Sequence, residues 1–212
     1  MNGRDEVLAR VRHALGTPTH PVEVPRRYRS EGSRAADSED LKALLVDRLE
    51  DYGATVIRTI GEGEIVATLL DVLAGRASAT RPALHAPGLP DRWLAGLEVR
   101  PDDGSASPRE LDAVPAVVTG CALAIAETGT IVLDGSAMCG RRLLTLVPDV
   151  HVCIVPTTSV VETVPEGLRR LAPDRPLTFV SGPSATSDIE LQRVDGVHGP
   201  RTLIVLLAEM VS

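Results

Sequence analysis

The feature that most constrains this chain is a set of continuous apolar runs in its second half. The main runs are VHVCIVP (150–156), LTFVSG (177–182) and TLIVLLAE (202–209). Strands with one solvent-exposed face alternate apolar and polar residues, whereas strands buried on both faces lack that alternation. Shorter β-branched runs precede them, at PAVVTG (115–120), ALAIA (122–126) and TIVLDG (130–135). The second half of the chain therefore predicts a buried sheet.

Helical patterns are interleaved with strand-like runs. Ser38 is a good N-cap for a leucine-rich helix that ends at Gly53. Further helices are predicted over Glu62–Ala74 and Ser159–Leu171, and Asp102–Arg109 is predicted as a polar loop. Earlier strands are predicted at ATVIRTI (54–60), PALHA (82–86) and LEVRP (97–101). This order predicts an α/β fold with helices layered around a largely parallel or mixed sheet.

The first 37 residues are predicted to form a helix and a flexible arm beside a domain over 38–212. Asp5–Leu15 has apolar residues at helical spacing. Thr17–Asp37 contains three prolines, no periodicity and four arginines, which form either a small basic patch or a solvated loop. Its few apolar residues offset little of the ordering cost of about 1–2 kcal/mol per residue. We expect this arm to be mobile in the isolated chain or ordered only by a partner subunit.

Composition excludes several classes of function. The formal net charge of −7 argues against a nucleic-acid binder, which needs a dense cationic face. The only aromatic residues, too few for a platform that stacks bases, are Tyr28, Tyr52, Trp93 and Phe179. No apolar run reaches the roughly 20 residues that span a bilayer, so no transmembrane segment is expected.

The cysteines and the N-terminal segment indicate a cytoplasmic protein without a metal site. Charges interrupt the apolar positions of MNGRDEVLARVRHAL, which is unlike a signal peptide. Cys121, Cys139 and Cys153 are an odd, widely spaced set without a CxxC motif. This usage fits a reducing compartment and excludes a self-contained four-cysteine iron–sulfur cluster. We therefore expect no metal ligands and no cofactor in this chain.

The segment AETGT (126–130) is the first candidate site. Glu127 is the one charged residue in an uncharged stretch from Val114 to Leu133, so it is a candidate nucleophile or general base. The alternative is a glutamate in a hairpin turn that faces water. Thr128, Gly129 and Thr130 are the candidate substrate-binding residues beside it.

The segment SGPSATSDIE (181–190) is the second candidate site, because it offers hydroxyl and backbone N–H groups after a buried run. Its candidate binding residues are Ser181, Gly182, Ser184, Thr186 and Asp188. The S-x-x-E spacing that begins at residue 187 is typical of a helix N-terminus, which attracts carboxylate or phosphate. The alternative is capping without a ligand.

The segment GVHGP (196–200) supplies the third group. His198 is a candidate general acid or base, or else a loop histidine bonded to backbone, and Gly199 is a candidate binding residue. His151 opens a buried run and is interpreted as structural. Ligands in open α/β sheets bind outside the carboxyl ends of parallel strands, so we expect the three segments to meet in one pocket for a small hydroxy- or keto-acid. GVHGP precedes its strand, so it reaches that pocket if the last strand is antiparallel or a long loop returns; otherwise it lies at the opposite edge of the sheet.

AETGTIVL, SGPSATSDIE and GVHGP, in this order and with these separations, resemble the LUD-domain family and, within it, the lactate utilization C subunits. The resemblance covers roughly Ser38 to Ser212, and the N-terminal helix and Pro-rich arm also fit. The chain departs from the family pattern at Ala185, where a basic residue is usual. If that cation contacts an anionic ligand, either the ligand differs here or another cation replaces it, the candidates being Arg141, Arg142 and Arg201.

This resemblance implies a fold similar to the NagB/RpiA/CoA-transferase group. It also implies that the chain is the cluster-free subunit of an iron–sulfur complex that oxidises L-lactate to pyruvate, with the clusters in partner subunits. A second hypothesis is a stand-alone enzyme of acyl or CoA transfer, because AETG also loosely resembles the glutamate-bearing loop of some CoA transferases. Glu127 would then be the nucleophile.

Overall fold

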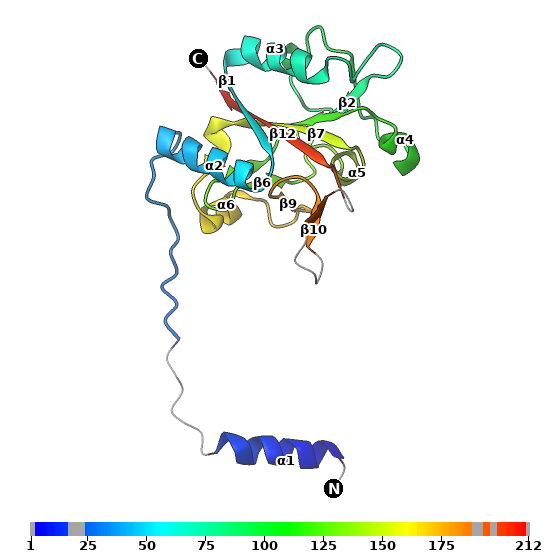
Figure 1. Cartoon of the computed structure of the whole chain (residues 1–212). Coiled ribbons are helices and arrows are strands. Elements are labelled where there is room, and N and C mark those ends of the chain that lie inside the picture. Colours follow the sequence, from blue (N-terminus) through cyan, green and yellow to red (C-terminus); the bar gives the residue numbers. More distant parts are fainter. Residues whose placement is uncertain (1–2, 17–23, 188–192, 196–198, 211–212) are drawn as a thin grey trace.

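The computed structural model describes residues 3–16, 24–187, 193–195 and 199–210. Within these residues, six strands form a parallel sheet in the order β1-β12-β7-β4-β2-β3 (Figure 1). The bounds are β1 (Thr55–Ile60), β12 (Thr202–Glu209), β7 (Val150–Pro156), β4 (Val117–Thr119), β2 (Ala83–His85) and β3 (Val99–Pro101). The predicted α/β fold with a largely parallel sheet is confirmed.

The central strands are apolar throughout because both faces of the sheet are covered. In β7, Val152 and Ile154 join one buried cluster, while Cys153 and Val155 join another on the opposite face. The first cluster includes three residues of helix α3 (Gly61–Leu73), and the second includes three leucines of helix α2 (Glu39–Asp51). The continuous apolar runs of the sequence therefore follow from the layered arrangement.

Helix α2 begins and ends where the sequence predicts. The Ser38 hydroxyl accepts a hydrogen bond from the Leu41 N–H at 3.3 Å, so Ser38 is the N-cap. At the other end Gly53 adopts φ +86°, a conformation that favours glycine. The position of this helix matters because its C-terminal end contacts both candidate loops.

A second sheet packs beneath the first, in the order β8-β5-β6-β9. Its strands are β8 (Val160–Val161), β5 (Leu123–Ile125), β6 (Thr130–Leu133) and β9 (Thr178–Val180). Strand β6 is antiparallel to both β5 and β9. The two candidate loops follow β5 and β9, which run in the same direction because each is antiparallel to β6 between them. Both loops therefore lie at the carboxyl ends of strands of the second sheet.

Several short elements differ from the sequence-based expectations. Helix α6 is Val164–Arg170, which is shorter than predicted because the 3-10 turn Thr157–Ser159 and β8 come first. Helix α4 (Pro108–Asp112) begins inside the predicted polar loop, and its N-cap Ser107 forms a capping box with Glu110. The structure also contains the 3-10 turn Asp91–Trp93 and helix α5 (Arg142–Leu146).

Ser187, where a helix was predicted to begin, is the last residue of a short strand, and the residues that would continue that helix, 188–192, lie outside the described residues. Strand β10 (Ala185–Ser187) pairs antiparallel with β11 (Arg193–Asp195). The S-x-x-E spacing is a weak signal, because serine and glutamate at that interval also occur in strands and loops.

The N-terminal helix α1 (Gly3–Leu15) buries none of its residues and extends away from the domain (Figure 1). Residues 24–37 have no regular secondary structure and connect toward α2. None of the helices in the described part of the chain has the length and apolarity needed to cross a bilayer.

Candidate functional site

Glu127 lies in the tight turn of the β5–β6 hairpin. The turn closes with a hydrogen bond from the Gly129 N–H to the Ala126 carbonyl at 3.2 Å. Gly129 adopts φ +55°, and a Cβ there would lie 2.8 Å from the carbonyl carbon of Arg48 in α2. Only glycine allows this close approach, so the TG pair of the motif fixes the turn against α2.

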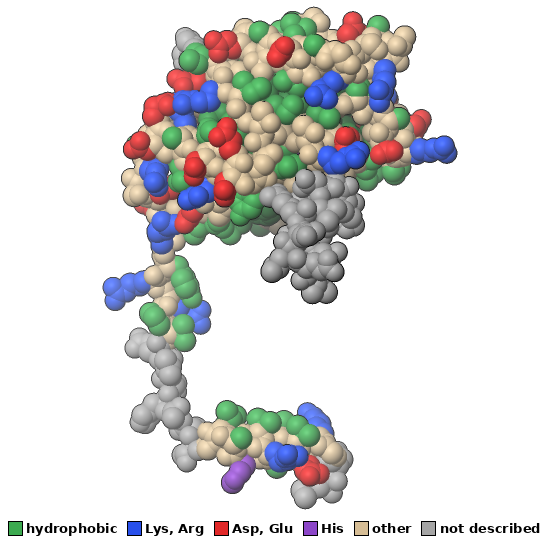
Figure 2. Space-filling model, in the orientation of Figure 1, with side chains coloured by type: hydrophobic (Ala, Val, Ile, Leu, Met, Phe, Trp, Pro, Cys, Tyr) green, Lys and Arg blue, Asp and Glu red, His purple; other side chains and the backbone are tan. Residues whose placement is uncertain are grey.

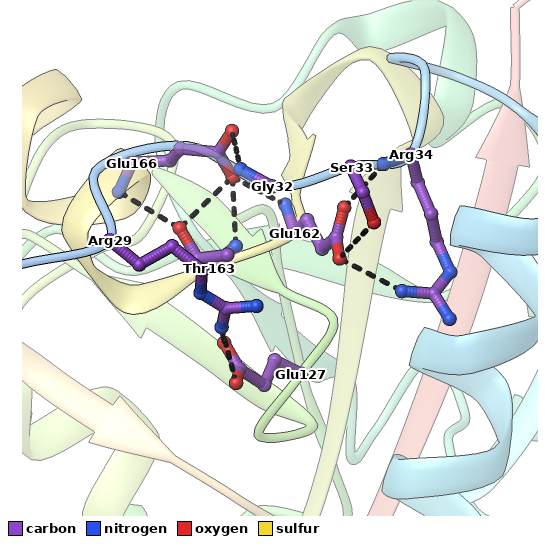
Figure 3. Close-up of polar contacts among 8 residues, drawn as sticks. All are labelled: Arg29, Gly32, Ser33, Arg34, Glu127, Glu162, Thr163 and Glu166. Carbon is purple, nitrogen blue, oxygen red and sulfur yellow. Dashed lines mark hydrogen bonds and ion pairs between the residues drawn. The ribbon is translucent and has the colours of Figure 1, made fainter.

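The carboxylate of Glu127 forms an ion pair with the N-terminal arm. One terminal nitrogen of Arg29, Nη2, lies 2.6 Å from both Oε1 and Oε2 of Glu127 (Figure 3). The exposed fractions of the two side chains are 58% for Arg29 and 45% for Glu127. Glu127 is therefore a glutamate in a hairpin turn, and its carboxylate is paired with Arg29, a contact that the sequence did not predict.

The arm continues across two further glutamates (Figure 3). The Glu162 side chain, only 6% exposed, accepts hydrogen bonds from the Arg34 N–H at 2.6 Å and from Arg34 Nη1 at 2.8 Å. Glu166 accepts one from the Gly32 N–H at 3.0 Å. The Arg34 backbone N–H is the main cause that holds the pKa of Glu162 below its usual value, and the Arg34 guanidinium adds to it. We call residues 29–34 the strap.

A chain of hydroxyl groups links the two candidate loops. Thr130 Oγ1 lies 2.8 Å from Thr128 Oγ1 and 2.7 Å from Ser181 Oγ. The register of β6 against β9 pairs Ile131 with Val180, which places Thr130 beside Ser181. AETGT and SGPS, about 50 residues apart in sequence, therefore lie side by side at one end of the second sheet.

The SGPS loop is fixed from two directions. A Cβ on Gly182, which adopts φ +96°, would lie 2.6 Å from the carbonyl oxygen of Tyr52 at the end of α2. On the other side, the Ser184 N–H donates to the Pro200 carbonyl at 2.8 Å. The described end of GVHGP thus meets the SGPS loop, because Gly199 and Pro200 lead directly into β12.

These contacts enclose a cavity of about 340 Å³, which we call the SGPS cavity. It lies at the amino ends of β7 and β12, whereas the sequence analysis expected the carboxyl ends. Residues 178–184 and Gly199 and Pro200 form much of its wall. The remaining lining residues are Thr145, Leu146, His151 and Leu203. Glu127 is not among the described residues that line it.

His151 provides the imidazole of this cavity. The side chain lines the SGPS cavity although the residue is only 2% exposed, and its Nε2 lies 2.8 Å from Thr119 Oγ1. Burial lowers the pKa of His151 to about 4, so the ring is neutral at pH 7. A neutral imidazole can accept or donate one hydrogen bond toward a ligand without adding charge.

The structure brings together most of the described candidate residues and leaves others aside. Ser181, Gly182, Ser184 and Gly199 line the SGPS cavity. Thr130 contacts its rim through Ser181, whereas Thr128 and Gly129 lie in the turn behind it. Thr186 belongs to β10, and nothing is described of its side chain. Asp188 and His198 lie outside the described residues.

Sequence reasoning missed part of the cavity. Thr145 and Leu146 come from the short helix α5, which carried no clear helical signal. His151 was visible as a polar residue at the start of a buried run, but its interpretation as structural gave it no place in the site. Its hydrogen bond to Thr119 requires the pairing of β7 with β4, which the sequence does not specify.

The cations proposed to replace the family's basic residue lie outside the SGPS cavity. Arg141 Nε binds Asp102 Oδ2 at 2.7 Å, and Arg201 Nε binds Asp149 Oδ1 at 2.5 Å. Arg142 is exposed at the start of α5. None of these three arginines is among the described residues that line the cavity.

Comparison with known proteins matches this chain to one protein family over most of its length. The family model described as LUD domain matches residues 26–208. The chain is 46% identical to a Lactate utilization protein C of Deinococcus radiodurans, over 90% of this chain and 85% of the relative. It is 30% identical to an uncharacterized protein of Neisseria meningitidis serogroup B, over 97% and 93%.

A solved structure agrees with the fold. The crystal structure of a DUF162 family protein from Deinococcus radiodurans matches with a TM-score of 0.66 and 36% sequence identity. The match covers 80% of this chain and 96% of the solved one.

Proposed function

Because the chain belongs to the LUD domain family, we propose that it acts in lactate utilization as the cluster-free subunit of an iron–sulfur complex that oxidises L-lactate to pyruvate. The relatives named Lactate utilization protein C, from Deinococcus radiodurans and from Bacillus subtilis, support the role in lactate utilization. The proposal further holds that the chain works in a complex with iron–sulfur partner subunits.

The clusters are assigned to partner subunits on the chemistry of the residues present here. Cys121, Cys139 and Cys153 are buried and free. Burial raises the pKa of the Cys139 thiol to about 11, which disfavours the thiolate that binds metal. Within the described part of the chain, His, Cys, Asp and Glu side chains form no group of three or more that could hold a metal ion.

The SGPS cavity is the observation that carries the substrate site. Its volume of about 340 Å³ is at the small end of ligand pockets and suits a hydroxy- or keto-acid. Ser181 and Ser184 offer hydroxyl groups to a carboxylate, and the neutral His151 ring offers one further hydrogen bond. Glu127 and His198 remain the proposed catalytic residues. Glu127 is not among the described residues of the cavity wall, so we propose that its carboxylate reaches a ligand at the rim once Arg29 releases it.

Binding of pyruvate and L-lactate to the isolated chain tests this site. We expect the Ser184→Phe variant, whose ring fills the cavity rim, to weaken binding at least about tenfold by isothermal titration calorimetry. Ser105→Phe, in an exposed loop, is the matched control and should bind as the unmodified chain does. Equal affinities for all three proteins would reject the SGPS cavity as the substrate site.

The alternative is the stand-alone transferase. In this proposal the Glu127 carboxylate attacks the thioester carbon of an acyl-CoA, the C–S bond breaks, CoA leaves as its thiolate and the acyl group stays on Glu127 as a mixed anhydride. The Glu127→Gln variant should form no such adduct. The exposed side chain of Glu127 favours this alternative, because an acyl-CoA in solution can reach its carboxylate. Mass spectrometry of the intact protein distinguishes the two proposals, because the subunit hypothesis predicts no adduct.

A further inference from the structure

A second depression runs along the amino end of the six-stranded sheet, next to the SGPS cavity. Its volume is about 730 Å³, and we call it the amino-end groove. Its wall includes residues at or just before the first residues of β12, β7, β4 and β2, which are consecutive in the sheet. Four strands about 4.8 Å apart give the groove a length of about 14 Å.

Three arginines from different places in the sequence line this groove. Arg81 donates from Nε at 3.2 Å and from Nη2 at 3.0 Å to the Ala113 carbonyl. Arg76 donates from Nε to the Val72 carbonyl at 3.1 Å. Both guanidinium groups are therefore held by neutral carbonyl oxygens, which position them without neutralising their charge.

The remaining charges of the groove leave it cationic. Arg201 is paired with Asp149, and Asp112 is the other acidic residue of the wall. Three arginines against two aspartates give the groove a charge of +1, although the chain as a whole carries −7. Figure 2 shows basic side chains with acidic ones between them at the end of the domain where Figure 1 places β2, α4 and α5.

We propose that the amino-end groove binds a phosphorylated small molecule of nucleotide size, with its phosphate groups at Arg76 and Arg81. A guanidinium matches a phosphate geometrically, because two parallel N–H groups meet two oxygens. Leu146 and Gly199 line both the amino-end groove and the SGPS cavity, and Arg201 lies in the groove two residues after Gly199. We place the organic part of the ligand along the strand ends, from the phosphate position toward Arg201. This inference does not depend on lactate as the substrate of the cavity.

Calorimetric titration of the full chain at low salt tests the proposal with ADP, inorganic pyrophosphate and adenosine as probes. We expect ADP to bind most tightly, pyrophosphate about tenfold more weakly, and adenosine without measurable heat. Affinity for ADP falls as salt rises, because the arginines are exposed to solvent. Failure of both ADP and pyrophosphate to bind overturns the proposal, and equal affinities overturn the extended part of the site.

Three variants locate the phosphate position. Arg76→Ala removes a side chain whose one described bond lies within its own helix and turn, so we expect a stable protein with affinity for ADP lowered about tenfold or more. Asp112→Asn removes a repulsive charge and should raise the affinity. Arg170→Ala, exposed on α6, is the charge-matched control and should leave it unchanged. Equal effects of Arg76→Ala and Arg170→Ala contradict the assignment.

Discussion

At the scale of single residues, Glu127 and Glu162, two of the three glutamates bound by the strap, differ in burial and therefore in how much each ion pair contributes to stability. Glu162 is almost fully buried, so its charge depends on the hydrogen bonds that Arg34 supplies. Glu127 and Arg29 are both substantially exposed, and water screens their attraction. The Arg34–Glu162 ion pair thus stabilises the fold, whereas the Arg29–Glu127 ion pair can open at little cost in free energy.

The variants Glu162→Gln and Glu127→Gln test this difference, since each removes a charge and preserves shape. We expect Glu162→Gln to lower the free energy of unfolding by about 1–3 kcal/mol, because the Arg34 groups lose a charged acceptor in a buried place. Glu127→Gln should lower it by less than about 1 kcal/mol. Urea denaturation measures both values, and equal losses would contradict the account.

His151 gives the protein a distinct response to pH. Its pKa is about 4 in the folded state, below the ordinary value near 6.5 that the unfolded chain regains. The unfolded chain therefore binds more protons between these values, and stability falls as the pH drops from about 6.5 to 4. We expect this residue to account for a loss of about 3 kcal/mol across that window.

The variant His151→Gln isolates that contribution. The slope of unfolding free energy against pH between about 4 and 6.5 should flatten, whatever the absolute stability of the variant. His13→Gln, an exposed histidine of α1, is the control and should keep the slope of the unmodified chain. A slope unchanged by His151→Gln would show that the ring titrates equally in both states.

At the scale of elements, the arm has two parts with different contacts. The strap makes backbone hydrogen bonds through Gly32 and Arg34, whereas α1 buries no residue. The strap is the part of the predicted arm, Thr17–Asp37, that contacts the domain in the structure, and the mobility of the arm in the isolated chain stays a prediction. A Cβ on Gly32 would collide with the side chain of Glu162, so glycine allows the strap to pass this close to Glu162.

Hydrogen–deuterium exchange tests that division within the arm. We predict slow exchange at the amides of Gly32 and Arg34, which are bonded to Glu166 and Glu162, and fast exchange at Val24 and Arg27, in the irregular segment before the strap. In Glu162→Gln the protection of Arg34 should decrease. Fast exchange at all four amides of the unmodified chain would show that the strap does not form in solution.

Most elements could be predicted from the sequence, because their signals are local. The cap at Ser38 and the strands at 150–156 and 202–209 depend on neighbouring residues alone. The antiparallel direction of β6 in the second sheet could not be predicted, because ALAIA and TIVL are buried on both faces and lack the alternation that would distinguish them. Helices α4 and α5 have five residues each, which is too short for a hydrophobic period to appear.

The candidate site was predictable only in part for the same reason. AETGT and SGPS were recognised from their small and polar residues, and β6–β9 pairing brings them together. The contact of Arg29 with Glu127 joins residues 98 positions apart, so no local sequence pattern predicts it. The SGPS cavity lies at the amino ends of β7 and β12. The general rule for α/β sheets places ligands at the carboxyl ends of the parallel strands, so it does not predict this cavity.

At the scale of the whole molecule, the layers explain where ligands can be held. Helix α3 covers one face of the parallel sheet, while α2 and the second sheet cover the other, and α6 lies outermost (Figure 1). The SGPS cavity forms where the SGPS loop of the second sheet meets the amino ends of β7 and β12. The amino-end groove continues from it, so both proposed sites lie at the same end of the domain.

The measurement that tests the central claim most directly is lactate-dependent dye reduction by the complex purified from the native host through a tag on this chain. The account predicts that iron–sulfur subunits co-purify, that dye reduction is lost when the chain is absent, and that adding the purified chain restores it. Full dye reduction by the iron–sulfur subunits without this chain would contradict the proposed role.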